Sequence, residues 1–363
     1  MAPPNGIKQY DSSLWSFGIL TFLCCFGVAG VAFLHQKDQW NRTAEQARTD
    51  MRRIPPELIG YRQTAVFATP VPGKPTSFAL LSESTFVVGS AEPPMLSLFD
   101  ETGTLLRTID LPDDPLAIVC GTPDTIFTDK IVVAHPKREI NRSVIAIYDT
   151  EGNRETSWKY FGMDYRSIVL TPTHFFAACS HDRFVYRFDA TGELDGGFGN
   201  INHLIGFYGF IVYAAPMTMT FSPKSSLLYV TSPGRHRVEV FTHDLTYQPE
   251  LSWGEPSGRL EGFAACCNPI GLAVLDDGRI LTVEKGVSRI KIYRTDGTLD
   301  TVVAGADILD HSPSGLTQRT PLEPGGRYFS AVLLSDGRIA VFDFEGFIRI
   351  FVPLESRDHE MIY

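Results

Sequence analysis

A short apolar segment that ends in an aromatic residue recurs six times along the chain, and this repetition restricts the possible folds more than any other feature. Side chains within each copy alternate between two faces, which is the period of a β-strand. The copies are MLSLFDETG (95–103), VIAIYDTEG (144–152), FVYRFDATG (184–192), VEVFTHD (238–244), IKIYRTDG (290–297) and IRIFVPL (348–354), and their closing aromatics are Phe99, Tyr148, Phe188, Phe241, Tyr293 and Phe351. Successive closing aromatics lie 49, 40, 53, 52 and 58 residues apart. Repetition at this period is typical of a β-propeller, in which each repeat forms one small sheet, or blade.

Two further strand-like segments precede each copy, so every unit supplies three or four strands. Asp277-Gly278 and Asp336-Gly337 join two such segments, and an Asp-Gly pair favours a tight hairpin turn because glycine tolerates a positive φ. We therefore predict an all-β fold, a six-bladed β-propeller over residues 61–356, followed by a tail over 357–363. A β-sandwich is the alternative, but its strands lack this long period.

The last unit ends soon after its third strand, at Pro353, and therefore lacks an outer strand. The segment QTAVFAT (63–69) stands just before the first blade and is able to supply that strand. Such an arrangement would close the ring by joining the two ends of the repeat region. Cys120 and Cys179 fall inside predicted strands, where we expect them to be buried core residues.

Residues 14–34 form an uncharged apolar run of 21 residues ahead of the repeats. As a helix with a rise of about 1.5 Å per residue, this run would span roughly 30 Å, the thickness of the hydrocarbon core of a bilayer. Trp15 and Trp40 lie near its ends, where aromatic residues often mark the membrane interface. We predict an N-terminal tail (1–13), a single transmembrane helix (14–34) that contacts the lipid bilayer, and a juxtamembrane helix or linker (35–60). A buried soluble helix and a cleaved signal peptide are the alternatives.

The formal net charge of −10 excludes bulk electrostatic attraction to nucleic acid. Cations gather on the C-terminal side of the apolar run, whereas the N-terminal side carries Lys8; those C-terminal cations are Lys37, Arg42, Arg48, Arg52 and Arg53. The positive-inside rule alone would therefore place the propeller in the cytoplasm, but the rule weakens for long translocated domains and acidic residues interleave with these cations. The residues by themselves leave the orientation open.

The units resemble NHL repeats, whose blades share a Pro-led apolar strand, the turn D-G-R-[IV] and a closing strand V-x-[VIK]-[YF]. The strongest likeness covers residues 261–305, where E-G-F-x-x-C-C-N-P is followed by T-x-E-K-G-x-x-R-x-K-x-Y. This combination is similar to a branch of membrane-anchored or exported bacterial NHL proteins of largely unassigned function. The resemblance implies a single-pass protein of the cell inner membrane with its propeller on the periplasmic side.

Enzymes that resemble this fold hold a metal ion on the propeller axis: calcium in lactonase-like hydrolases, and zinc held by histidines in NHL-type amidating lyases. The inner strands of this chain begin with KPTS, DPLA, DYRS, APMT, NPIG and RYFS, none of which contains histidine. Oxygen ligands could come from Asp113, Asp114, Asp164 and Asn268 alone. Because this departs from both enzyme patterns, we predict no metal and no other cofactor, and a metal-dependent hydrolase is the least favoured hypothesis.

Cys266, Cys267 and Asn268 stand just before the first strand of their blade, near the face where propellers usually bind ligands. Three interpretations of the adjacent thiols stay open: reduced packing residues, a strained vicinal disulfide that acts as a redox switch or ligand platform, or part of a metal or cluster site. Two cysteines fall short of a four-ligand zinc or iron–sulfur centre.

Three charged residues, Glu284, Lys285 and Arg289, follow on the same blade. On alternate positions of the sheet they could form an ion pair or hold the carboxylate of a partner. Fixing a loop is the more ordinary role for such a group.

Residues 195–212 separate the third and fourth blades and combine glycines with many apolar side chains. Exposed apolar groups of this kind mark a contact with a partner or a membrane, and the alternative is a fourth strand plus a loop folded over the rim. We select Phe198, Phe207, Tyr208 and Phe210 as candidate partner contacts.

The sequence contains no convincing catalytic constellation. The leading hypothesis is therefore a non-enzymatic, membrane-anchored propeller that serves as an interaction or scaffold subunit of a membrane protein complex. The alternative is a redox-linked or small-ligand-binding propeller centred on Cys266 and Cys267.

Overall fold

In the computed structural model, the described residues are Lys37, Gln46 and the ranges 49–137, 142–161, 164–213, 215–311, 329–343 and 345–355. The chain separates into two compact units, Met1–Met51 and Arg52–Tyr363. The predicted transmembrane helix over 14–34, Trp15 and Trp40 lie outside the described residues. In the part of the chain that is described, no helix is both long and apolar enough to cross a membrane.

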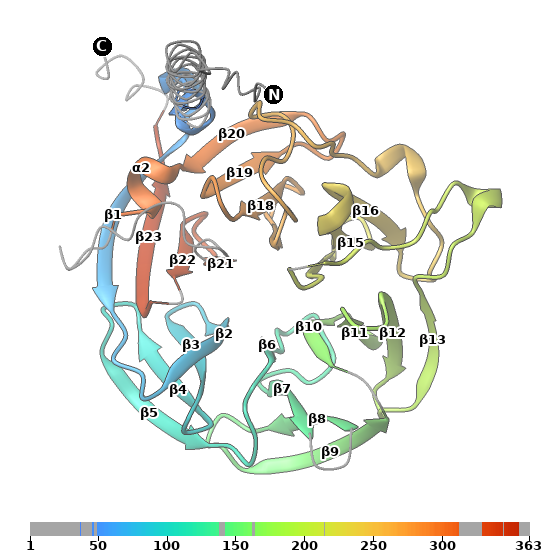
Figure 1. The fold of residues 1–363 in the computed structure, drawn as a ribbon. Helices are drawn as coiled ribbons and strands as arrows, with labels where there is room; N and C mark the ends of the chain where they lie inside the picture. The colour runs from blue at the N-terminus through green and yellow to red at the C-terminus, as the bar shows by residue number, and fades with distance from the viewer. Residues whose placement is uncertain are drawn as a thin grey trace, which may run out of the picture. The chain divides into compact units, whose positions relative to one another are not determined.

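The second unit is a ring of six small antiparallel sheets around a central axis (Figure 1). Blade 1 holds β2 (Lys74–Ser82), β3 (Thr85–Ala91), β4 (Met95–Asp100) and β5 (Leu105–Asp110); blade 2 holds β6 (Ala117–Cys120), β7 (Ile131–Lys137), β8 (Arg142–Tyr148) and β9 (Arg154–Phe161); blade 3 holds β10 (Tyr165–Leu170), β11 (His174–Cys179), β12 (Phe184–Asp189) and β13 (Leu194–Phe198). Blade 4 has three strands, β14 (Met219–Ser222), β15 (Leu227–Ser232) and β16 (Arg237–Thr242); blade 5 holds β17 (Gly271–Val274), β18 (Ile280–Glu284), β19 (Arg289–Tyr293) and β20 (Leu299–Ala304). The all-β, six-bladed propeller is confirmed.

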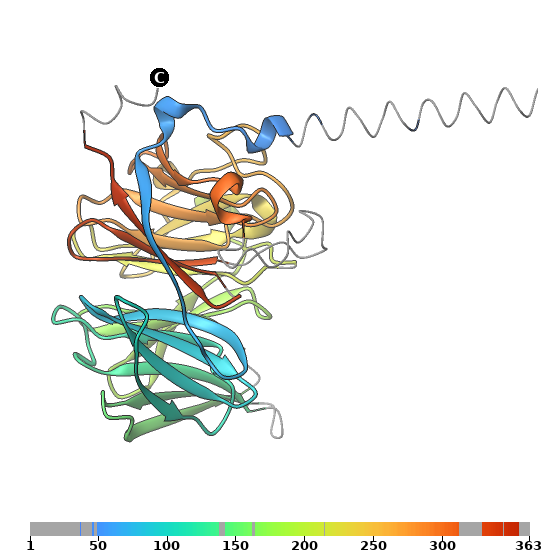
Figure 2. The ribbon, with the colours of Figure 1, turned by 90° about the vertical axis from the view of Figure 1, so that its left-hand side faces the viewer.

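Blade 6 is built from both ends of the repeat region. It holds β21 (Phe329–Leu333), β22 (Ile339–Asp343) and β23 (Phe347–Pro353), and its outer strand is β1 (Tyr61–Ala68). β1 runs antiparallel to β23, with Tyr61 opposite Pro353 and Ala68 opposite Phe347 (Figure 2). The expected closure of the ring by the segment around 63–69 is therefore confirmed.

Buried aromatic side chains join neighbouring blades. All six closing aromatics of the third strands are buried, with exposed fractions of 3% or less. Phe78 of blade 1 stacks on Phe342 of blade 6 at 5.1 Å between ring centroids, and Tyr160 of blade 2 lies 4.5 Å from Phe188 of blade 3. The repeated aromatic residues therefore form the core between the blades, since each blade buries its faces against the next one. Cys120 and Cys179 are buried in β6 and β11, as predicted.

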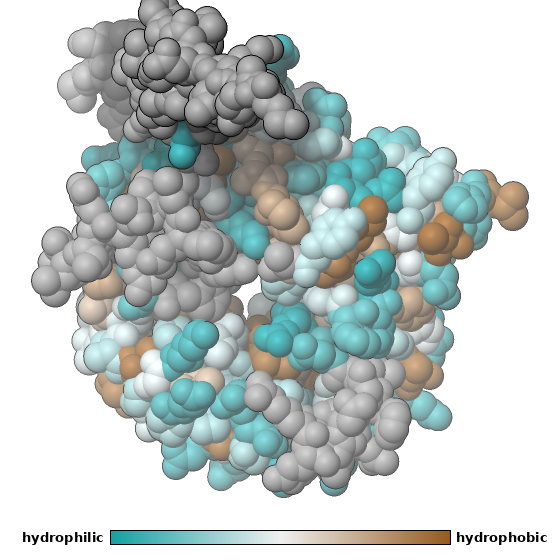
Figure 3. Space-filling view, in the orientation of Figure 1, coloured by the Kyte–Doolittle hydropathy of each residue, from teal (hydrophilic) through white to brown (hydrophobic). Residues whose placement is uncertain are grey.

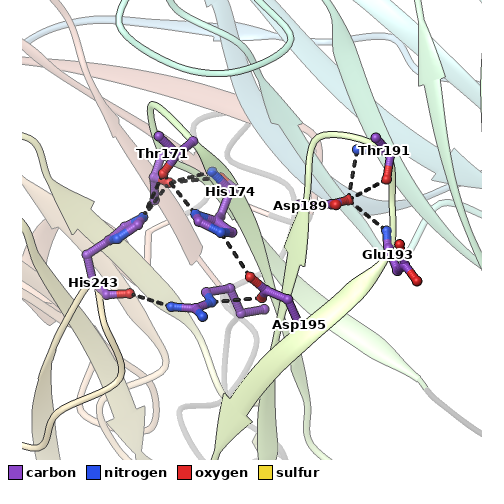
Figure 4. A network of polar contacts seen from close by, with 9 residues as sticks. Thr171, His174, Asp189, Thr191, Glu193, Asp195 and His243 are labelled. Carbon is purple, nitrogen blue, oxygen red and sulfur yellow. Dashed lines mark hydrogen bonds and ion pairs between the residues drawn. The ribbon is translucent and has the colours of Figure 1, made fainter.

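The two predicted Asp-Gly hairpin turns are present in the structure. Gly278 and Gly337 have φ of 95° and 80°, in the left-handed region that an Asp-Gly hairpin turn requires. The turns that lead into the fourth strands are capped by an aspartate: the Asp189 carboxylate accepts hydrogen bonds from the backbone N–H groups of Thr191 and Glu193, both at 2.9 Å (Figure 4). These side chains satisfy the backbone at the edge of the blade and fix the turn.

Candidate functional site

The cysteine pair lies on a loop that leads into β17. Cys266 is exposed and Cys267 is buried, and their Sγ atoms are 3.0 Å apart. The structure therefore holds two free thiols at these positions rather than a disulfide, whose bond length is about 2.05 Å. Ala265 and Cys267 both have positive φ, 59° and 66°. The backbone thus turns sharply around Cys266 and presents its thiol outward.

Asn268 ties this loop to the end of β18. Its side-chain amide donates to the carbonyls of Ala264 and Lys285, at 2.6 and 2.9 Å, and its side-chain oxygen accepts from the N–H of Lys285 at 2.8 Å. Asn268 is fully buried. It is therefore a structural clamp, and its oxygen is not available as the metal ligand considered from the sequence.

A buried ion pair lies beneath the same loop. Lys291 Nζ is 2.7 Å from Glu284 Oε1, and neither side chain is exposed. Lys291 also donates to the carbonyls of Leu260 and Gly262, at 2.8 and 2.6 Å, while the Glu284 carboxylate accepts from the N–H of Ala264 at 2.9 Å. Burial lowers the pKa of Lys291, and the nearby Glu284 carboxylate opposes that shift. The two charges satisfy each other and the loop backbone at once.

The placement of the charged trio resolves the two roles considered for it. Glu284, Lys285 and Arg289 are all buried, with exposed fractions of 0%, 6% and 1%. Arg289 donates to the carbonyls of Gly258 and Arg259 in the same loop, at 3.4 Å each. Glu284 and Arg289 therefore fix the loop, and the burial of all three residues excludes their holding the carboxylate of a partner. Lys291 was not predicted from the sequence; it partners Glu284 because the two lie on the same face of adjacent strands.

Blade 6 has a similar buried ion pair, in which the basic residue also binds a backbone carbonyl. Arg349 of β23 lies 3.8 Å from Asp343 of β22 and donates to the carbonyl of His311, in the segment that follows β20, at 2.6 Å. Burial raises the pKa of Asp343, and Arg349 partly offsets that shift. A basic residue on the third strand of a blade thus reaches back to the backbone that enters the blade. In blade 5 this contact positions the two cysteines.

The second candidate site is the segment between β13 and β14, where three of the four selected aromatic residues are buried. Phe198, Phe207 and Phe210 are buried, with exposed fractions of 8%, 2% and 3%. They pack on Phe241 and Tyr247, because the glycines between them let the chain fold back over the rim of the blade. Tyr208, at 55%, is the selected residue that is exposed.

The outer side of this segment carries other apolar residues that the selection missed. Ile201, Leu204, Ile205, Tyr208 and Tyr213 are exposed, and Leu204 reaches 97%. We call this set the apolar protrusion. Figure 3 shows hydrophobic residues at the outer edge of the ring, where this segment lies in Figure 1.

The apolar protrusion is ordered by its own hydrogen bonds. The short helix η3 (His203–Ile205) begins at Asn202, whose side chain accepts from the N–H of Leu204 at 3.1 Å. Backbone bonds join Asn202 and Phe207 in both directions, and the Arg235 guanidinium lies 5.3 Å from the centre of the Tyr208 ring. The exposed groups are therefore held by a fixed backbone on a buried aromatic base.

A polar network joins blades 3 and 4 (Figure 4). The His174 and His243 rings lie 5.1 Å apart between centroids, and Nε2 of His174 is 3.0 Å from Asp195 Oδ2. Arg187 donates to Asp195 at 2.8 Å and to the carbonyl of His243 at 3.3 Å. Burial lowers the pKa of His243, and the neighbouring His174 and Arg187 act in the same direction. Each group has a partner, so the network links two blades structurally.

The centre of the ring is open in the space-filling view (Figure 3). Asp164, one candidate oxygen ligand, is paired with Arg166 at 3.0 Å. Partly exposed side chains on the inner strands β17 and β21 are small or apolar. Among the described residues, no group of three or more His, Cys, Asp or Glu side chains is placed to hold a metal ion.

The fold and its geometry define a closed six-bladed β-propeller. No protein-family model matches the chain, and no curated protein has a significant sequence match. Similar solved structures are a protein of unknown function from Bacteroides thetaiotaomicron (TM-score 0.53, 14% identity, covering 82% of this chain and 74% of that one), the WD40 propeller domain of Doa1 (0.52, 10%, 82% and 99%) and virginiamycin B lyase from Staphylococcus aureus (0.52, 11%, 81% and 100%). At these identities the likeness shows the propeller fold alone.

Proposed function

We propose that this chain is a non-enzymatic interaction module that docks a protein partner through the apolar protrusion. One observation carries the proposal: Leu204 is 97% exposed beside Phe207 and Phe210, which are almost fully buried. Large apolar side chains that are held outward on a rigid base form a preorganised contact, because the ordering cost is met before the partner arrives.

The chemistry of the apolar protrusion favours a protein surface over lipid or nucleic acid. Residues 199–213 contain no lysine or arginine, and the whole chain carries a net charge of −10. Anionic lipid headgroups and phosphate backbones both select clusters of basic residues. An apolar groove lined by aromatic or aliphatic side chains is the complementary partner surface.

The proposal places the propeller on a membrane. The uncharged run over 14–34 supports a single-pass anchor in the cell inner membrane, and the resemblance of residues 261–305 to exported NHL proteins supports a periplasmic propeller. A partner in the same membrane would meet the apolar protrusion at a high effective concentration, so a small contact suffices. The module would then serve as a subunit of a membrane complex.

The experiment compares two photo-crosslinking side chains in the full-length protein within its native membrane. One replaces Leu204, and the other replaces Leu106 on the outer strand β5, where Leu106 is 53% exposed. The proposal predicts one discrete protein adduct from position 204 and none from position 106. Leu204→Asp should abolish co-purification of that protein in mild detergent, whereas Leu106→Asp should leave it intact.

Other outcomes would contradict the proposal. Adducts with lipid from position 204 would make the apolar protrusion a membrane contact instead. Equal adducts from both positions would mean that the protrusion is not a specific surface.

A further inference from the structure

The cysteine pair combines three properties that ordinary packing does not require. The two Sγ atoms are 3.0 Å apart, closer than non-bonded sulfur atoms ordinarily approach. Cys266 is exposed, whereas Cys267 beneath it is 1% exposed. The loop that holds them is fixed by Asn268 and Glu284 through buried hydrogen bonds.

We propose that Cys266 and Cys267 form a reversible vicinal disulfide by exchange with an organic disulfide, which makes this loop a redox-responsive site. The inference is independent of the proposed partner docking, because it rests on blade 5 and not on the segment between blades 3 and 4. Bond formation requires the sulfur atoms to approach by about 1 Å, since a disulfide measures about 2.05 Å.

The exchange has two balanced steps. The Cys266 thiolate attacks one sulfur of the disulfide RS–SR, which breaks that bond, releases RS⁻ and leaves a mixed disulfide on Cys266. Cys267 then loses its proton and attacks the Cys266 sulfur, which forms the vicinal bond and releases the second RS⁻. The two protons from the cysteines convert both leaving groups to RSH, so the pair is oxidised by two electrons and the external disulfide is reduced.

The order of the two attacks follows from exposure. A dissolved disulfide can reach Cys266, but the burial of Cys267 excludes it from direct attack. Once Cys266 carries the mixed disulfide, Cys267 is the adjacent nucleophile and needs no access to solvent. The loop clamps keep the sulfur atoms together, because Asn268 and the buried charges prevent the chain from opening around them.

The local chemistry points to a slow responsive site rather than a thiol–disulfide catalyst. The hydrogen bond with Cys267 raises the pKa of the Cys266 thiol, burial adds to that shift, and the Lys285 ammonium opposes it. Catalytic cysteines of oxidoreductases instead have a depressed pKa that keeps them as thiolates. We therefore expect equilibrium with the surrounding thiol pool over a long period and no rapid turnover.

The test uses the full-length protein in detergent, equilibrated with graded mixtures of reduced and oxidised glutathione, quenched with acid and alkylated. The tryptic peptide spanning 260–279 contains both cysteines and no others. As the oxidant increases, this peptide should pass in one reversible transition from double alkylation to none, with the loss of the mass of two hydrogen atoms. The peptide spanning 108–130, which contains the buried Cys120, should stay reduced and provides an internal control.

Two variants make the outcome decisive. Cys267→Ser should instead retain one glutathione on Cys266, and Cys266→Ser should remain a free thiol at position 267. The proposal is overturned if the peptide stays reduced at every ratio, or if both cysteines of the unmodified chain carry glutathione independently.

Discussion

Lys291 Nζ lies 2.7 Å from Glu284 Oε1 in an ion pair that has no solvent exposure on either side. Replacing one partner leaves the other charge buried without its nearest counterion, and breaking a buried pair in this way typically costs about 3–5 kcal/mol. We expect Lys291→Met to lower the free energy of unfolding by about that amount in urea denaturation. Lys130→Met, which breaks the exposed pair with Glu155, is the control and should change little. Equal effects of the two substitutions would contradict a structural role for the buried pair.

The aromatic base and the exposed tip of the segment between β13 and β14 should respond oppositely to truncation. Phe207 is 2% exposed, so Phe207→Ala should cost about 3–5 kcal/mol of unfolding free energy through lost burial and a cavity. Leu204→Ala should be close to neutral, because that side chain is almost fully exposed. Thermal or urea unfolding of both variants measures the contrast. A costly Leu204→Ala would show that the apolar protrusion packs on the fold.

The network between blades 3 and 4 predicts a loss of stability in acid. The pKa of His243 is lowered by burial and by His174 and Arg187, so the folded state binds fewer protons than the unfolded chain near pH 6. That contribution is present above the unfolded histidine pKa of about 6.5 and is lost as pH falls through the folded value. Because the ring is partly exposed, we expect the loss of stability between pH 7 and 5 to be small. His243→Asn should flatten the stability–pH curve by that amount, and an unchanged curve would contradict the assignment.

Thiol reactivity should rank the cysteines of the propeller by exposure. Cys266 should be alkylated in the folded protein, whereas Cys120 and Cys179 should react only after unfolding. Burial raises the pKa of Cys120 to about 12, which further suppresses its thiolate. Lys285→Gln should slow alkylation of Cys266 several-fold, because the ammonium group favours the thiolate. Peptide mapping after timed alkylation gives both results, and a faster reaction in the variant would count against the role of Lys285.

Ring closure can be tested by two deletions that differ in residues 52–69, the segment that contains β1. A chain that begins at residue 52 retains β1 and should unfold in one cooperative transition. A chain that begins at residue 70 lacks β1 and leaves the edge of β23 unpaired. Unpaired strand edges promote association, so we expect a lower unfolding midpoint and aggregation, detected by light scattering. Equal stability of the two chains would show that closure contributes little.

The architecture was predictable from the sequence because each blade of a propeller is formed by one sequence repeat and packs mainly on its neighbours. The aromatic that closes each third strand, such as Phe99 or Tyr293, packs between blades at a fixed place in every repeat. Closure by the segment around 63–69 was also predictable, since the last repeat lacked one strand. These features depend on neighbours within one or two blades, which the period already specifies.

The contacts made by irregular loops were not predictable in the same way. Phe207 and Tyr208 are adjacent aromatics in a glycine-rich segment, yet one is buried and the other exposed, because an aperiodic loop gives no sign of which side faces the core. Lys291 alternates within its strand as a polar residue would on an exposed face. Its burial depends on a loop some 30 residues earlier that folds over it. The residues of this contact are visible in the sequence, but the sequence pattern does not predict that the loop folds over Lys291.

The pairing of β1 with β23 also has a consequence for biosynthesis. The N-terminal strand of the ring leaves the ribosome before every blade, yet its partner β23 is the last of the described strands to emerge. In a nascent chain, β1 therefore lacks its partner and keeps an open edge until residues 347–353 have been made, when the ring can close. Premature termination would leave that edge exposed, which offers quality-control proteases and chaperones a direct way to tell a truncated product from a finished one.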